Sequence, residues 1–400
     1  MEESTEKQSM QKVKNILLYT TLFILGSYFL FDGLAVAKGF LIPVSIAVLL
    51  SLLMLPLCRW LEGKGISRGW AVLVCDLCIL LAIMGLFFLV SAQIKNIVDD
   101  WPQLKKQVQP KMERMQQFFE DKTGLDADPH IQSFMEQVPF STQSVPEGET
   151  QAGDQAKSRD TENEVTTLAK SAIGLFGIFA ATLLVLVYVF FFMYFRRKFR
   201  KFILMAVPAS GREKAEDTLR KTSTVAMNYL VGKGVLIIFL AALYGIGLSI
   251  VGIEYALLIS IIAALLSLIP YIGNVIGGGM AMLLGLVTGG GFEAAIGVLI
   301  VFSIIQFIES YILEPFVVGH KVDLNPAFTI IVVVLGGAVW GVAGMVVAIP
   351  YLAILKVVMD HIEPLKPYGY LIGEEEDEKN GGWLDKFENW FDKKVVSRFR

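Results

Sequence analysis

The chain has 400 residues, 54% of them apolar and 18% charged, with a formal net charge of −3. Soluble proteins carry about 25% charged residues, and here the charges are missing from long apolar runs. This composition excludes a disordered chain, and the near-neutral total lacks the basic footprint of a nucleic-acid-binding protein. The three cysteines form no disulfide framework.

Four long apolar runs in the first half of the chain are predicted to cross a membrane, whose hydrocarbon core needs about 20 residues of helix. These runs are Ile16–Phe31, Leu34–Cys58, Trp70–Ala92 and Ser171–Phe195. A fifth predicted span, Val235–Val251, follows an amphipathic stretch. The first run lacks a small-residue cleavage site, so we expect an uncleaved span rather than a signal peptide.

Short basic segments flank these runs and predict their orientation. Arg196–Lys201 is the densest of them, and two others lie at Lys7–Lys14 and Arg59–Arg68. Basic flanks stay on the cytoplasmic side of a membrane, and the first four spans satisfy all three at once. We therefore expect a multi-pass protein of the cell (inner) membrane, with both termini in the cytoplasm and residues 93–170 outside.

Two further apolar stretches, Tyr255–Gly291 and Pro326–Leu355, are interrupted in the middle. The first breaks at Pro270–Asn274 and the second around Gly336–Gly344. Irregular backbone survives at membrane depth only where protein or a water-filled cavity surrounds it. We interpret both stretches as re-entrant helical hairpins on either side of a full span, Phe292–Ile312. With either hairpins or two complete spans for each stretch, His320–Lys321 lies on the cytoplasmic side, whereas one kinked span for each stretch would place these residues outside.

The predicted fold is an all-α polytopic membrane protein with about six full spans and two broken or re-entrant hairpins. It also has an extracytoplasmic helical insertion. In chain order the predicted parts are the N-terminal tail with spans one to three (1–92), an extracytoplasmic helical region with a flexible acidic loop (93–170), span four with a cytoplasmic amphipathic helix (171–230), a core with both hairpins (231–360), and a cytoplasmic amphipathic tail (361–400).

Polar and acidic residues inside apolar runs are candidates for a solute or ion pathway, because a charge at membrane depth is costly and faces a cavity or a partner. Glu309 is the sharpest candidate, with Gln306 three residues earlier on the same helix face. Glu314 precedes a proline near the predicted membrane boundary, and Asp76 lies about 10 Å into its predicted span. A structural hydrogen bond, an ion pair or an interfacial position is the alternative for these acids.

The two predicted hairpin tips supply the other pathway candidates. A pair of Gly- or Pro-interrupted apolar segments is the best sequence indication of a transporter's substrate site. Close helix packing through G-x-x-x-G spacing is the alternative. The tip residues singled out are Pro270, Gly273, Asn274, Gly277, Gly337 and Gly341.

Enzymatic and metal chemistry find no support in the sequence. Cys75 and Cys78 have C-x-x-C spacing but lie within a predicted span, and the three histidines are isolated. Phosphate-binding, zinc-protease and serine-hydrolase motifs do not occur. We therefore expect no enzyme, no catalytic residues, no metal site and no cofactor. Any uphill transport would draw on an ion gradient.

Several segments in a fixed order carry a family resemblance. They are Leu41–Pro43, Leu55–Pro56, Tyr229–Gly232, Gly252–Leu258, Leu268–Gly273, Gln306–Pro315, Asn325–Pro326, Gly341–Met345 and Ala348–Pro350. Together they resemble the autoinducer-2 exporter (AI-2E) family of permeases, and the resemblance covers roughly the whole membrane part.

The resemblance implies a multi-pass exporter with both termini cytoplasmic. It also implies a homo-oligomer, with pentamers known in the family, and an elevator-like movement of the hairpin-bearing half. Some relatives are linked instead to Na⁺/H⁺ antiport. This chain departs from the commoner pattern at Asn274, where a proline often follows P-Y-I-G, in a polar insertion at Ser141–Glu164, and in a Trp-rich tail.

Three hypotheses follow from these features. The first is secondary export of a small polar metabolite or signal, similar to autoinducer-2, by alternating access of the hairpin unit against an oligomeric scaffold and coupled to H⁺ or Na⁺. The second is Na⁺(Li⁺)/H⁺ antiport through Glu309, with Asp76 or Glu314. The third is a non-transporting membrane scaffold whose glycines only pack helices. Expected partners are the solute, the coupling ion, the lipid bilayer and further copies of the chain, with no nucleic acid.

Overall fold

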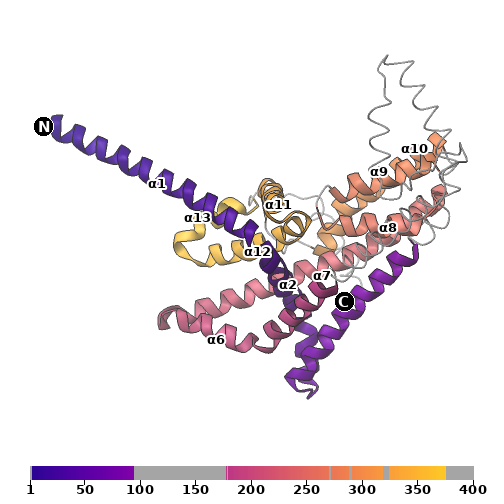
Figure 1. Cartoon of the computed structure of the whole chain (residues 1–400), viewed down its shortest axis with the longest axis horizontal. Helices are drawn as coiled ribbons and strands as arrows, with labels where there is room; N and C mark the ends of the chain where they lie inside the picture. Colours follow the sequence, from indigo (N-terminus) through magenta and orange to yellow (C-terminus); the bar gives the residue numbers. More distant parts are fainter. Residues whose placement is uncertain are drawn as a thin grey trace, which may run out of the picture.

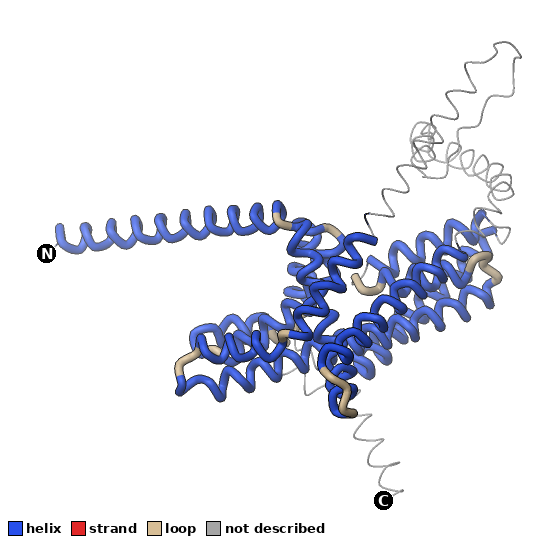
Figure 2. Tube along the Cα trace, turned by 60° about the horizontal axis from the view of Figure 1, so that its bottom comes forward, coloured by secondary structure: helices blue, strands red, loops and turns tan. Residues whose placement is uncertain are grey.

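The computed structural model describes residues 2–93, 177, 179–269, 272–287, 291–318 and 324–374. Within these ranges the chain is built from helices joined by turns and short loops (Figure 2). The predicted all-α fold is thereby confirmed. The expected outer helices, the acidic loop and the Trp-rich tail lie outside the described residues, as does Pro270.

Short connections join most of the helices. In chain order the labelled α-helices are α1 (Glu2–Val36), α2 (Lys38–Gly63), α6 (Arg196–Ala206), α7 (Arg212–Val251), α8 (Ala256–Leu266), α9 (Ile272–Val287), α10 (Gly291–Ile308), α11 (Pro326–Trp340), α12 (Val342–His361) and α13 (Lys366–Ile372). Two further helices, Arg68–Gln93 and Phe179–Tyr194, lie between α2 and α6. The π-helix η2 (Glu309–Val318) continues α10, and the 3₁₀-helices η1 (Ala209–Gly211) and η4 (Glu363–Leu365) precede α7 and α13.

Among the described residues, six helical segments are long and apolar enough to cross a membrane. They are Leu17–Val36, Lys38–Gly63, Arg68–Gln93, Ala209–Val251, Gly291–Glu314 and Val342–His361. The multi-pass membrane architecture is therefore confirmed, although the set of spans differs from the prediction. The described part of the fourth predicted span forms the helix Phe179–Tyr194, and α6 follows it at a bend of 62°. The segment α12, expected as half of a hairpin, reaches span length because Pro350 lies within the helix without ending it.

The described helices form two apolar cores. The N-terminal core joins α2 to the two unlabelled helices through side chains such as Cys58 and Met193. The second core joins α7 to α12 around Leu240, Ile259 and Phe302. In Figure 1, α8, α9 and α10 lie together with the C-terminal half of α7, while α11 and α12 pack on each other nearer the middle of the molecule. The second core contains both stretches that the sequence predicts to be broken.

The first break separates α8 from α9 and depends on glycine. The two helices pack as an antiparallel pair with Gly273 directly against the backbone of Leu266 and Ser267, where a Cβ atom would collide. One turn later, a Cβ on Gly277 would lie 2.5 Å from the Cβ of Ala263. These contacts let α9 fold back closely on α8, as a helical hairpin requires.

The second break is a single residue. Gly341 separates α11 from α12 with φ 62° and ψ −142°, a conformation that a residue with a Cβ rarely adopts. The sequence predicts an interruption spread over Gly336–Gly344, whereas the helices continue to Trp340 and resume at Val342. Since the turn takes one residue, the helical hydrogen bonds are kept almost to the tip.

The first helix stands apart from both cores. It continues through Asp32 and Gly33, where the sequence predicts an interruption, and it ends at Val36. Figures 1 and 2 show it as a straight rod with the N-terminus at its far end. Its base is held by Trp340, whose Nε1 donates to the Leu34 carbonyl at 2.9 Å. The predicted break was wrong because one glycine costs a helix only about 1 kcal/mol.

Gly277→Ala should destabilise the protein, since the added methyl group meets Ala263. Overpacking of this kind costs about 1–3 kcal/mol. The matched control is Gly279→Ala on the same helix, where no atom lies within 4 Å of the added Cβ. Thermal unfolding of the purified proteins in detergent should show a lower Tm for Gly277→Ala only. Equal Tm values for the two variants would contradict the close α8–α9 contact.

Candidate functional site

Glu309 is a buried carboxylate in the second core. Only 6% of its surface is exposed. It continues the buried stripe of α10, which runs through Val298, Phe302 and Ile305 at spacings of four, three and four residues. At Glu309 the α-helix becomes the π-helix η2, a form that is rare and frequently marks functional sites. The helical pattern therefore carries an acid into apolar surroundings.

A short chain of hydrogen bonds connects Glu309 to two other helices. Asn274 on α9 donates through Nδ2 to Glu309 Oε2 at 3.4 Å. The hydroxyl of Tyr244 on α7 donates to Asn274 Oδ1 at 2.6 Å. The Tyr244 ring is fully buried and stacks on Phe302 with 4.5 Å between ring centroids. Asn274 is thus held from one side by Tyr244 and presents its amide to the carboxylate on the other.

An ammonium group lies in the same core. Lys233 on α7 is 7% exposed, and its Nζ lies 3.0 Å from Glu314 Oε1. Lys233 also attracts Glu309 electrostatically. The cluster therefore contains two carboxylates and one ammonium. If both carboxylates are ionised, one negative charge is left over.

The structure brings together only some of the predicted pathway residues. Asn274, Glu309 and, through Lys233, Glu314 belong to one cluster. Gln306 instead donates to the Ser310 hydroxyl at 2.9 Å, so that it bonds along its own helix. Asp76 is on the helix Arg68–Gln93, whose side chains pack in the N-terminal core, and its buried Oδ1 has no hydrogen-bond partner among the described residues.

The predicted glycines have packing contacts of their own. Gly273 and Gly277 bring α9 against α8 on either side of Asn274. Gly337 lies against the Met345 side chain, and Gly341 forms the turn between α11 and α12. The glycines of α9 therefore position a polar member of the cluster, and those of α11 shape the second break.

Lys233 and Tyr244 belong to the cluster although no sequence motif predicted them. Both lie on one buried stripe of α7 that contains, in order, Tyr229, Lys233, Leu236, Leu240, Tyr244 and Leu248. A lysine at a stripe position of an otherwise apolar run is a signal that the sequence does contain. Lys233 falls between the predicted amphipathic stretch and the predicted fifth span, which begins at Val235, so neither prediction contains it.

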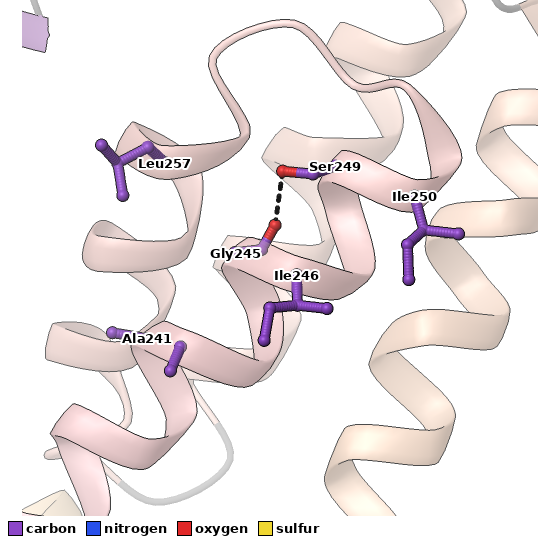
Figure 3. Close-up of a pocket in the computed structure, with 7 residues that line it drawn as sticks. Ala241, Gly245, Ile246, Ser249, Ile250 and Leu257 are labelled. Carbon is purple, nitrogen blue, oxygen red and sulfur yellow. Dashed lines mark hydrogen bonds between the residues drawn. The ribbon is translucent and has the colours of Figure 1, made fainter.

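A separate open groove lies along α7 and the start of α8, with a volume of about 560 Å³ (Figure 3). No charged residue lines it, and the Ser249 hydroxyl is satisfied by the Gly245 carbonyl of its own helix at 2.7 Å. The remaining lining side chains are apolar, among them Ile246, Ile250 and Leu257. This groove does not have the polar groups that a small polar solute needs.

Exposed charged groups at the start of α7 and after α12 differ from the cluster. Hydrogen bonds from Lys366 and Lys214 hold the pKa of Glu363 below its ordinary value. These side chains are exposed, so solvent screens their interaction. They supply matched controls for the ion pair between the buried Lys233 and Glu314.

Comparison with known proteins places the sequence among membrane transporters. The profile described as "AI-2E family transporter" matches residues 17–363. The chain is 29% identical over 370 residues to YrrI of Bacillus subtilis (strain 168), which covers 88% of this chain and 98% of YrrI. It is 26% identical over 319 residues to YueF of the same strain, with 78% and 82% covered. It is 23% identical over 349 residues to YhhT of Escherichia coli (strain K12), with 85% and 90% covered. All three are named "putative transport protein".

Lys233→Met should destabilise the protein, because it leaves Glu314 without the ammonium group that lies 3.0 Å from it. We expect a loss of about 1–3 kcal/mol, since Glu314 is half exposed and keeps part of its hydration. The double variant Lys233→Met/Glu314→Gln should recover part of this loss. Denaturant or thermal unfolding in detergent measures both.

The control for this pair is Lys214→Met, which breaks the exposed ion pair with Glu363. Exposed pairs contribute about 0–1 kcal/mol, so its unfolding should change little. A Lys233→Met protein as stable as Lys214→Met would contradict the importance of the buried ammonium.

Proposed function

The chain belongs to the AI-2E transporter family, and we propose that it is a secondary transporter in which Glu309 carries the coupling ion. The proposed cargo is a small polar metabolite or signal, similar to autoinducer-2, exported across the cytoplasmic membrane. The observation that carries the proposal is the buried Glu309 carboxylate with its polar partners in an apolar core. An ionisable residue at membrane depth is by default a functional site.

The charge of the cluster favours a proton or one monovalent cation as the coupling ion. Lys233 neutralises one of the two carboxylates, and an isolated ionised carboxylate in apolar surroundings is strongly unfavourable. Binding of one proton or one Na⁺ at Glu309 removes the remaining charge. We expect the site to gain and lose this ion as its access to water changes.

The hydrogen bond from Asn274 offers a way to couple that ion to movement. Asn274 is on α9, in the α8–α9 hairpin, whereas Glu309 begins η2. A carboxylate attracts the amide N–H group, and its neutralisation weakens that attraction. Ion binding at Glu309 would therefore loosen the hairpin from η2. In the proposed alternating-access cycle the hairpin unit then shifts, elevator-like, against a scaffold formed by an oligomer.

A second candidate function is Na⁺(Li⁺)/H⁺ antiport through the same carboxylate. In the described part of the chain the charged cluster is compact and the open groove is apolar. Both features favour the transport of ions without an organic solute. Both functions use Glu309, and they differ in whether an organic solute crosses. The family assignment favours either of them over the scaffold hypothesis.

Glu309→Gln should abolish ion coupling while leaving the fold intact, because glutamine keeps the shape and a hydrogen-bond acceptor for Asn274 but cannot exchange a proton. Proton flux into proteoliposomes with a trapped pH-sensitive dye measures this, with and without a Na⁺ gradient. We expect the variant flux to fall to the level of protein-free vesicles. Glu293→Gln, an exposed glutamate in the first turn of α10, should keep the wild-type flux.

The same assay separates the two candidate functions. Na⁺-dependent proton movement without any organic solute supports antiport. Proton movement that requires added extract of small polar metabolites supports export, and metabolite profiling of a deletion strain against an overexpressing strain then identifies the cargo. Wild-type flux in Glu309→Gln would remove Glu309 from both mechanisms.

A further inference from the structure

The helix α6 turns sharply away from the apolar helix Phe179–Tyr194 that precedes it. It begins at Arg196, directly after Phe195, and is inclined by 62° to the helix Phe179–Tyr194. A bend of this size takes the axis of α6 well away from the direction of the preceding helix. Five of its first six residues are basic, which rules out a position inside the hydrocarbon core.

One side of α6 is apolar and exposed. Phe199, Phe202 and Ile203 share a face at the spacing i, i+3, i+4, with 46%, 70% and 40% of their surfaces exposed. No residue of α6 is buried. A short helix with this separation of apolar and basic sides is typical of one that lies in the membrane interface.

The basic side chains of α6 divide into two groups. Arg196 is held by Glu62 and by the Cys58 sulfur, with its Nη2 atom 2.5 Å from Glu62 Oε2. Arg200 forms an ion pair with Glu216 on α7. These two arginines fix the helix to the rest of the protein.

The other three basic residues, Arg197, Lys198 and Lys201, are exposed. Within the described ranges no carboxylate pairs with any of them. Their positive charge is therefore available at the level where α6 meets the membrane surface. A group of basic residues directly following a membrane span attracts anionic phospholipids.

We propose that α6 is an interfacial helix that binds anionic phospholipid headgroups through Arg197, Lys198 and Lys201. Phe199, Phe202 and Ile203 enter the acyl boundary of the same leaflet. The apolar face alone would accept any lipid, and the three cations provide the selectivity for a negative headgroup. The 3₁₀-helix η1 and the Arg200–Glu216 ion pair join α6 to the N-terminal end of α7. The bound lipid therefore also fixes that end of α7, the helix that carries Lys233 and Tyr244.

Native mass spectrometry of the full chain in detergent tests this proposal. The protein is titrated with phosphatidylglycerol or phosphatidylcholine of identical acyl chains. The test variant is Arg197→Gln/Lys198→Gln/Lys201→Gln. The control, Lys214→Gln/Arg220→Gln/Lys366→Gln, removes the same charge from side chains that pair with described carboxylates outside α6.

Wild type and control should retain phosphatidylglycerol at lipid concentrations about tenfold lower than phosphatidylcholine, and added salt should reduce the difference. The test variant should bind both lipids equally and unfold at the wild-type Tm. An unchanged preference in the test variant would overturn the proposal. A preference lost in the control as well would also overturn it, because the effect would then follow net charge and not α6.

Discussion

The free energy needed to keep Glu309 inside an apolar core constrains the arrangement of α7, α9 and η2. A polar group buried without a partner is costly, and an unpaired charge is far more so. The carboxylate receives an amide N–H from Asn274 and lies in the field of Lys233. Those partners come from two different helices, so α7 and α9 cannot separate from η2 without exposing the charge to lipid or giving it a new partner.

Small residues make that arrangement sterically possible. Gly273 and Gly277 flank Asn274 along α9, and both touch α8 so closely that no larger residue fits without movement. The approach of α9 to α8 sets the depth at which the Asn274 amide lies. Of the two readings that the sequence offers for these glycines, packing contacts and tip markers, the contacts with α8 show the packing role.

The sequence predicts much of this, and the failures have specific causes. The burial of Glu309 follows from its place on the α10 stripe, and the two helix breaks follow from glycine and proline. Lys233 was missed because a lysine at a predicted boundary normally extends toward water, whereas α7 runs without interruption for 40 residues and places Lys233 on its buried face. The pairing of Gln306 with Ser310 was also unforeseen, since it depends on side-chain choices that a shared helix face does not determine.

Another charge cluster among the described residues, centred on Glu62, helps to explain why Glu309 is the better candidate. Glu62 interacts with two cations, Arg68 and Arg196, near the ends of their helices. That cluster has excess positive charge, and its members are partly exposed, so water and anions can balance it. The Lys233 cluster has the opposite excess and a carboxylate that is almost completely buried. Of these two clusters, it is the one in which a bound proton or cation would balance the excess charge, as the ion coupling proposed for Glu309 requires.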